Sequence, residues 1–377
     1  MLIINDIIDI PKAYQFEALY NLEKIVYFDI ETTGLSANTS YLYLIGCIYY
    51  KDSSYHLIQW FSEDIEEEEL LLCEFFQFIK DFDILVNYNG NSFDIPYLIR
   101  KCNQYKVAYS FDQIEHLDIY KKILPYKKIF KLDNYKQKSI ETFLDIKRED
   151  TFSGGQLIEV YQSYLGKKSI ENLRKIRFQD TPSLNLKEAD HLLKQLLLHN
   201  ADDLKGLASI SSILSYSDMF EQPIEVTRAT LNNEYFIIDF KLFSPVPKPL
   251  SFGNWVFNYS VDADLGCLKV KAFTGEFKYF YSNYKDYYYL PLEDRAIHKS
   301  VASFVDEGYK EKAKAATCYT KKQGTFLPQY DTIITPAFKQ SYQDKVTYFE
   351  VNEDLLSHIE AFSPYVSHII NHMVKSR

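Results

Sequence analysis

The feature that most constrains the fold is the order of apolar segments in the first hundred residues. The run Lys24–Ile30 (KIVYFDI) predicts a buried strand, and Tyr41–Tyr50 and Tyr55–Phe61 predict two more because β-branched and aromatic residues dominate them. A helical pattern at Ile65–Lys80 then leads to a short apolar run at Asp83–Asn87. Three successive strands followed by a helical crossover predict an α/β fold, a mixed sheet flanked by helices.

The rest of the chain divides into a helical region and a region of different character. A helix is expected from Asp94 to Cys102, and residues 139–215 favour helices, above all Asp190–Leu207. From about Met219 the pattern changes to that of strands, and 377 residues exceed a typical domain of roughly 100 to 200. We therefore expect one domain over residues 1–218 and a second, β-rich α+β domain over 219–377.

Two segments of the expected second domain return to helical spacing. These are Leu292–Thr317, which follows a proline, and the terminal stretch Glu353–Lys375. Both predict helices.

Composition narrows the class of protein. No apolar run approaches the roughly 20 residues that span a bilayer, and the first residues lack the pattern of a secretory signal, so we expect a cytoplasmic protein without a membrane partner. The five cysteines are far apart and form no CxxC pair, which argues against structural zinc and disulfides. A formal net charge of -10 means that any contact with nucleic acid must be local.

Asp29 and Glu31 alternate at the end of the first predicted strand. Because side chains two residues apart share one face of a strand, both carboxylates point to the same side. Such a pair repels itself unless a cation lies between the two groups, and Mg²⁺ prefers carboxylate oxygens. An isolated DxE of this kind is also common as a solvated strand end, so the pair alone decides nothing.

Two longer segments add specificity. Asp29–Ser36 reads DIETTGLS and resembles the first motif of the DnaQ-like, or DEDD, exonuclease superfamily. Asn87–Leu98 reads NYNGNSFDIPYL and is similar to the second motif of that superfamily in the form found in family-B polymerase proofreading domains. The resemblance implies a ribonuclease H-like fold over about residues 20–215. It places Asp94 at the start of a helix, where the dipole favours a carboxylate.

The third motif of the superfamily is a Tyr or His followed by an Asp about one helical turn later. His199–Leu207 reads HNADDLKGL, and the four-residue spacing puts His199 and Asp203 on one helix face. The spacing is that of the tyrosine subclass, yet the residue is histidine, so the segment departs from both usual subclasses. Asp202 is the rival fourth acid, and only the helical spacing favours Asp203.

Three weaker segments resemble the YprB-like branch of this superfamily. They are His116–Ile119 (HLDI), Lys138–Leu144 (KSIETFL) and Arg148–Gly154 (REDTFSG).

The resemblance implies a metal-dependent 3′–5′ exonuclease that uses two divalent ions, Mg²⁺ or Mn²⁺. Asp29 would bridge both ions, Glu31 and Asp203 would complete the shell of one, and Asp94 would hold the other. His199 would act as the general base. Substrate contacts are expected from the remaining motif residues, namely Thr32, Thr33, Gly34, Leu35, Asn89 and Phe93.

A basic segment from Lys121 to Lys138 is a candidate for contact with the polymer. It contains seven lysines and one aspartate, with Tyr126, Phe130 and Tyr135 interleaved and Tyr120 directly before it. Lysines that follow phosphates and rings that stack on bases are what single-strand binding requires, so Lys127 and Lys128 are expected substrate contacts. A solvated loop with core aromatics fits the same pattern. Lys310–Lys322 could extend the path, and Tyr279–Tyr289 could either stack bases or form strands.

Three functions remain open on this evidence. The leading one is an exonuclease acting on single-stranded RNA or DNA, with the C-terminal domain aiding substrate binding or holding a protein partner. The same acids would also serve a structure-selective endonuclease if the cleft is open at both ends. A non-catalytic nucleic-acid-binding scaffold is the third alternative, because a fold alone does not fix an activity.

Overall fold

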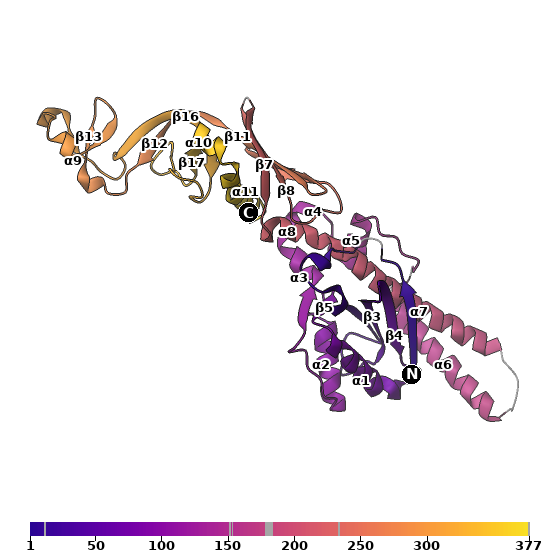
Figure 1. Cartoon of the computed structure of the whole chain (residues 1–377). Coiled ribbons are helices and arrows are strands. Elements are labelled where there is room, and N and C mark those ends of the chain that lie inside the picture. Colours follow the sequence, from indigo (N-terminus) through magenta and orange to yellow (C-terminus); the bar gives the residue numbers. More distant parts are fainter. Residues whose placement is uncertain (11–12, 151, 153, 178–183, 233, 376–377) are drawn as a thin grey trace. The chain divides into compact units, whose positions relative to one another are not determined.

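The computed structural model describes residues 1–377 apart from 11–12, 151, 153, 178–183, 233 and 376–377. The chain separates into two compact units, Met1–Leu214 and Ser215–Arg377, and each is described by itself (Figure 1). Within the described part, no helix combines the length and the apolar character needed to cross a membrane.

The first unit is built on a mixed sheet. Its strands in the described residues are β1 (Leu2–Ile8), β2 (Ile25–Thr32), β3 (Leu42–Lys51), β4 (Ser54–Phe61), β5 (Ile84–Asn87) and β6 (Glu115–Asp118). They lie in the order β1-β4-β3-β2-β5-β6. The first four pair antiparallel, while β5 and β6 run parallel to β2. The sheet and its flanking helices confirm the predicted α/β class, and β1 is a strand that the apolar pattern did not indicate.

Helices cover both faces of this sheet. They are α1 (Glu68–Phe78), α2 (Asp94–Tyr105), α3 (Ile119–Ile123), α4 (Lys127–Phe130), α5 (Gln137–Phe143), α6 (Gly154–Arg177) and α7 (Leu184–Ile210). One core joins β2 and β3 to α1 and α2, and a second joins β3 and β4 to α6 and α7. The predicted helix Ile65–Lys80 is shorter than expected because both of its ends are 3₁₀ turns.

The alternation of side chains along β2 decides which face carries the acids. Val26, Phe28 and Ile30 are buried in the core against α1 and α2. Asp29 and Glu31 therefore project from the opposite face of the sheet, the side on which α7 packs. The alternation of side chains along β2 therefore places the carboxylates of Asp29 and Glu31 on the face of the sheet that packs against α7.

The second unit is mainly antiparallel sheet. Its described strands are β7 (Glu225–Asn232), β8 (Tyr235–Lys241), β9 (Leu250–Gly253), β10 (Phe257–Asp262), β11 (Leu265–Lys271), β12 (Phe273–Phe280), β13 (Tyr287–Leu290), β14 (Arg295–His298), β15 (Glu311–Lys312), β16 (Tyr319–Gln329) and β17 (Thr347–Glu350). They form sheets ordered β7-β8-β11-β10-β9, β12-β16-β17 and β14-β13-β15. The helices are α8 (Ser215–Glu221), α9 (Lys299–Ala302), α10 (Glu353–Ser357) and α11 (Phe362–Lys375).

The predicted helix over Leu292–Thr317 is wrong. The segment contains β14, the short helix α9 and β15, and both strands pair with β13. Pairing with a neighbouring strand has overridden the local helical spacing. The terminal segment is helical as predicted, although it is interrupted after Ser357 before α11 begins at Phe362.

Candidate active site

Strand β2 and helix α7 bring three of the predicted side chains together. One ligand atom each from Glu31, His199 and Asp203 lies within 4.8 Å of the others. His199 Nε2 is 3.1 Å from Asp203 Oδ2 and 3.7 Å from Glu31 Oε1. The four-residue spacing on α7 thus places both of its side chains over the end of β2.

Helix α7 can approach this closely because of one glycine. Asp29, Gly46 and Gln59 occupy neighbouring positions on β2, β3 and β4. A Cβ atom on Gly46 would lie 2.1 Å from Asn200 Oδ1 and 2.5 Å from Leu204 Cδ1, so any other residue would force these two side chains of α7 to shift. The contact between sheet and helix therefore depends on the missing side chain.

The side chain of Asn200 lies over Gly46 and joins Gln59 on β4 to Asp29 on β2 through hydrogen bonds. Gln59 Nε2 donates to Asn200 Oδ1 at 2.9 Å, which fixes the amide with its nitrogen towards β2. Asn200 Nδ2 then donates to Asp29 Oδ2 at 3.0 Å. Gln59 also donates to the Leu197 carbonyl at 3.0 Å. One oxygen of Asp29 is thereby held in place by a chain of hydrogen bonds.

Asp94 reaches the same region from α2. It is the first residue of that helix, and its carboxylate accepts hydrogen bonds from its own N–H and from the N–H of Ile30, which lies between the two acids of β2. The loop before it is shaped locally: Asn87 Oδ1 accepts from Gly90 N at 2.8 Å, and Asn89 has a φ of 62°. We refer to Asp29, Glu31, Asp94 and Asp203 as the four-acid cluster.

The two adjacent aspartates of α7 have different partners. Asp202 Oδ2 accepts the backbone N–H groups of Glu149 and Asp150, at 2.8 and 2.7 Å. It holds that loop in place and does not face Glu31. Asp203 faces His199 and Glu31, in keeping with the preference drawn from helical spacing.

The loop held by Asp202 supplies a partner for the histidine. His199 Nδ1 donates to Asp150 Oδ2 at 2.6 Å, and both side chains are buried. This hydrogen bond fixes the ring so that Nε2 is directed at the four-acid cluster. Asp150 lies within the Arg148–Gly154 segment, of which residues 151 and 153 are outside the described part.

An arginine partly balances one acid. Arg148 contacts Asp203 Oδ1 and makes two hydrogen bonds of 3.0 Å to the buried carboxylate of Glu141. Gln137 Nε2 donates to Glu141 at 2.9 Å and to the Asp203 carbonyl at 2.8 Å. The positive charge is shared between two carboxylates, so little of it reaches the acids on β2.

The pKa values of the remaining acids show the resulting repulsion. Burial raises the pKa of Asp29 well above its usual range, and the charges of Asp203, Glu31 and Asp94 raise it further. Burial also raises the pKa of Glu31 to about 8, although His199 opposes this rise. The pKa of Asp94 is raised to about 7, again chiefly by burial. These groups lack sufficient positive charge within the chain.

His199 and Asp203 shift in the opposite sense. Burial works against the charged form of His199, but its hydrogen bond to Asp203 and the nearby carboxylates raise its pKa to about 9. Burial likewise disfavours the Asp203 carboxylate, yet His199 and Arg148 together lower its pKa. These two residues form an ion pair beside the uncompensated acids.

The donor set fits divalent cations with oxygen ligands. Buried carboxylates with raised pKa values are stabilised as anions when a cation is bound between them, and hard ions such as Mg²⁺ or Mn²⁺ take such ligands. Among the described residues, the group of possible ligands that meets here contains no cysteine, which disfavours a structural zinc centre.

The expected substrate-contact residues have varied environments. Leu35 is 88% exposed, and Gly34 accepts a 2.9 Å hydrogen bond from Thr32 Oγ1. Thr33 Oγ1 accepts from Tyr41 N at 2.8 Å, and Phe93 packs against Tyr97 just before α2. Thr32 and Thr33 therefore stabilise the turn after β2, whereas Leu35 is accessible to a ligand.

The basic segment lies partly around a groove. Tyr88, Asn89, Tyr120, Tyr135, Lys136 and Gln137 line a hollow of about 440 Å³. Lys127 and Lys128 are exposed on α4, and the Lys127 carbonyl accepts a hydrogen bond from the Tyr135 hydroxyl. Gln137 also donates to the Asp203 carbonyl, so this residue of the hollow's wall directly contacts the backbone of the four-acid cluster.

Sequence reasoning did not single out several residues that touch the cluster. Asn200 directly follows His199 in α7, but adjacent residues do not share a helix face, so the four-residue spacing gave no signal for it. Asp150 and Arg148 were noted only as part of a weak motif. Gln59 carries no signal in the sequence, because its partner Asn200 lies 141 residues away. Glu141 was likewise noted only within the weak segment Lys138–Leu144, although its partners Gln137 and Arg148 are 4 and 7 residues away.

Comparison with known proteins gives one family match and only weak likeness to solved structures. None of the curated protein sequences is similar to this chain. Among solved structures, the family B DNA polymerase of the archaeon Pyrobaculum calidifontis is 12% identical with a TM-score of 0.35, and the match covers 70% of this chain and 35% of the polymerase. Escherichia coli Exonuclease I, in complex with a dA16 oligonucleotide, is 11% identical with a TM-score of 0.26 and coverages of 59% and 55%.

This chain thus spans about a third of the polymerase and about half of the exonuclease, and scores this low carry no argument by themselves. The sequence match is more informative. Residues 26–215, which include β2, α2 and α7, match the RNase_H superfamily over half of the chain. The chain belongs to the RNase_H superfamily.

Proposed function

We propose that this protein is a metal-dependent nuclease that hydrolyses phosphodiester bonds of single-stranded nucleic acid. The observation that carries the proposal is the meeting of Glu31, His199 and Asp203 within 4.8 Å, beside Asp29 and Asp94. Three acids with raised pKa values in one buried place are costly without a bound cation. The proposal includes two ions, Mg²⁺ or Mn²⁺, with the four-acid cluster as their ligands.

Divalent ions held there would stabilise charge on the phosphoryl oxygens and favour a hydroxide nucleophile. The chain's own residues supply the rest. Asp150 fixes the ring of His199 through Nδ1 and leaves Nε2 facing the cluster. Against the effect of burial, Asp203 and Glu31 raise the pKa of His199 in the ion-free chain; cations bound to these carboxylates would remove that effect, and Nε2 could then take a proton from water. Asn200 fixes one oxygen of Asp29, and Arg148 keeps Asp203 ionised.

Cleavage from the 3′ end, with release of nucleoside 5′-monophosphates, is proposed from the resemblance of the three motifs. Membership of the YprB-like branch is proposed from His116–Ile119, Lys138–Leu144 and Arg148–Gly154. Structure-selective endonuclease activity and a non-catalytic scaffold are the alternatives that an experiment must separate.

The test is incubation of the full chain with oligonucleotides labelled at either end, with Mn²⁺, with Mg²⁺ or with chelator. Stepwise monomer release from the 3′ end supports the proposal, internal cuts indicate an endonuclease, and binding without cleavage indicates a scaffold. Asp29→Asn should reduce cleavage by more than the roughly 10- to 100-fold that loss of an outer partner costs. Asp190→Asn, an exposed carboxylate of the same helix α7, is the matched control and should retain full activity.

A further inference from the structure

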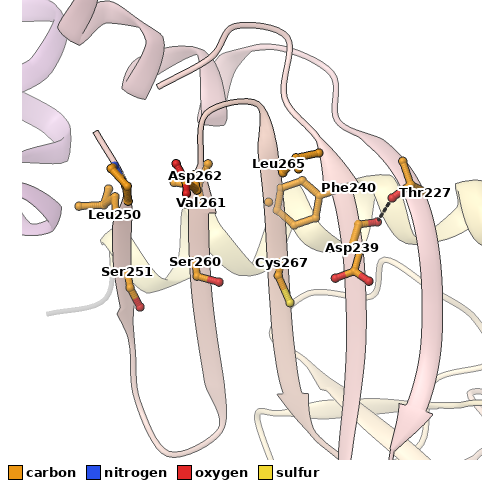
Figure 2. A pocket seen from close by; sticks show the side chains of 12 residues that line it. Thr227, Asp239, Phe240, Leu250, Ser251, Ser260, Val261, Asp262, Leu265 and Cys267 are labelled. Atoms are coloured by element: carbon orange, nitrogen blue, oxygen red, sulfur yellow. Dashed lines mark hydrogen bonds between the residues drawn. The ribbon is translucent and has the colours of Figure 1, made fainter. Parts of the chain in front are cut away.

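The five-stranded sheet of the second unit has one buried face and one open face. Along β8, Phe236, Ile238 and Phe240 are buried, and Phe236 contacts Phe362 at the start of α11 with ring centres 5.1 Å apart. The alternate residues of β8 point to the other face, which α11 does not cover. Figure 2 shows this sheet with α11 behind it.

One half of the open face combines lysines with aromatic rings. Lys269 and Lys271 on β11 lie over the rings of Tyr235 and Trp255, at 4.0 and 5.4 Å from the ring centres. No carboxylate of the described residues lies within ion-pair distance of either lysine. We call these four residues, with Asn258 beside them on β10, the lysine-aromatic patch.

Trp255 is presented to solvent by a fixed turn. Its side chain is 71% exposed, whereas the other tryptophan of the chain, Trp60, is 2% exposed. Asn254 Oδ1 accepts the N–H groups of Val256 and Phe257 at 2.8 and 3.0 Å, which holds the turn around Trp255. A large exposed ring on an ordered turn is a platform for stacking, because little entropy is lost when a partner binds.

A hollow of about 510 Å³ lies beside the patch. Four polar side chains line it in one row across neighbouring strands, as Figure 2 shows: Ser251, Ser260, Cys267 and Asp239. Hydroxyl groups and a carboxylate can pair with the donors and acceptors on the edge of a base. The other acid that lines the hollow, Asp262, lies at the end of β10 away from the lysines.

The segments that looked more basic or aromatic in the sequence are less available. Lys310 is buried and donates to the carbonyls of Ala302 and Val305, each at 2.8 Å. Lys321 pairs with Asp294 at 2.6 Å. In the run Tyr279–Tyr289, which forms parts of β12 and β13, tyrosine rings pack on one another. The lysines and tyrosines of these segments therefore contact other groups of the same unit and are less available to a ligand.

We propose that the open face of the five-stranded sheet binds single-stranded nucleic acid. Bases stack on Trp255 and Tyr235, phosphates contact Lys269 and Lys271, and a neighbouring base enters the polar hollow. Lysines without a carboxylate partner complement a polyanion, and the exposed ring of Trp255 and the half-buried ring of Tyr235 can stack on any base. The face therefore recognises a strand without strict sequence preference. The choice of ligand rests on the proposed function, but the site itself is separate from the four-acid cluster.

The test measures binding without cleavage. Full-length Asp29→Asn protein in chelator is titrated with fluorescein-labelled DNA and RNA single strands, and anisotropy gives the affinity. Adding Trp255→Ala should weaken binding roughly 5- to 100-fold, the loss of one stacked base, while Trp255→Phe should retain most of the affinity. Unlabelled strands should also quench the emission of Trp255, since Trp60 is inaccessible.

The lysines are tested by salt dependence. In a Lys269→Gln, Lys271→Gln double variant, the slope of log affinity against log salt should fall in magnitude by about 1.4, as expected for two lost phosphate contacts. Lys345→Gln, an exposed lysine elsewhere in the same unit, should change this slope by no more than half of that.

Equal affinity and slope in all variants, or no quenching of Trp255, would overturn the proposal. These experiments measure binding and not cleavage. A negative nuclease assay would therefore leave the binding proposal intact, and a negative binding result would leave the nuclease proposal intact.

Discussion

The two units of this protein deal with negative charge in opposite ways. In the second unit, Asp294 receives hydrogen bonds from Tyr289 and Tyr319 and an ion pair from Lys321, and these partners lower its pKa. In the first unit, Asp29 and Glu31 are buried among other acids and their pKa values are raised. Asp294 thus has its counter-charge within the chain. Asp29 and Glu31 do not, as expected of groups that would bind a cation.

The largest expected difference between the two sites is the effect of divalent ions on the free energy of unfolding. Mg²⁺ or Mn²⁺ at about 1,000 times its dissociation constant should raise the free energy of unfolding of the first unit by about 4 kcal/mol. Thermal or chemical unfolding followed with and without chelator measures this. Asp294→Asn should leave the ion effect intact and Asp29→Asn should remove most of it; an equal response of both variants would break the comparison.

The dependence of stability on pH should have opposite signs in the two places. The folded-state pKa of Glu31, about 8, exceeds its ordinary value of 4.5, so its contribution is fully present below pH 4.5 and is lost as pH rises through 8. Each pH unit over which the folded state binds one extra proton costs about 1.4 kcal/mol. Unfolding free energies from pH 5 to about 8.5, measured in chelator, should fall with pH.

Asp294 should act in the other sense. Because its pKa is lowered, its contribution is present above its ordinary value of 3.8 and is lost only as the solution becomes more acidic. A rise of stability with pH between 5 and 8 in the ion-free wild type, with no such rise in Glu31→Gln, would contradict the assignment of the slope to Glu31.

Removing a single charge should sharpen the contrast. In chelator at neutral pH, Asp29→Asn should raise the free energy of unfolding by about 1 to 3 kcal/mol, because it removes repulsion from a buried group. Asparagine can still accept the hydrogen bond from Asn200. Denaturant unfolding is the measurement, and a destabilised Asp29→Asn would mean that the cluster is compensated after all.

The smallest effect is expected for Asp294→Asn. Its carboxylate is partly exposed, so loss of the pair with Lys321 should cost about 0 to 1 kcal/mol. Asparagine also tolerates the φ of 50° at this position. The same denaturant experiment should therefore give a small loss of stability, opposite in sign to that of Asp29→Asn.

Much of the first unit could be predicted because its signals are local. Alternation along β2 put Asp29 and Glu31 on one face, and helical spacing put His199 and Asp203 on another. The contacts that join those faces could not be predicted, since Asn200 meets Asp29 across 171 residues of sequence. Asp150 comes from an irregular loop that has no periodicity to interpret.

The second unit was less predictable because several of its strands are short: β13, β14 and β15 have four, four and two residues. The helical spacing of Leu292–Thr317 was misleading for that reason, as β14 and β15 exist only through their pairing with β13. The boundary between separate domains, expected at 218/219, and the catalytic roles of the site residues stay predictions.

The absent side chain of Gly46 has a consequence for how this protein can vary. Half of the prospective ligands belong to the sheet and half to two helices, and the gap beneath α7 sets the spacing between Asp29 and the α7 residues. Gly46→Ala would force Asn200 and Leu204 of α7 to shift without removing any charged group. Affinity for the proposed ions should thus depend on an inert position, which a search confined to reactive residues would overlook.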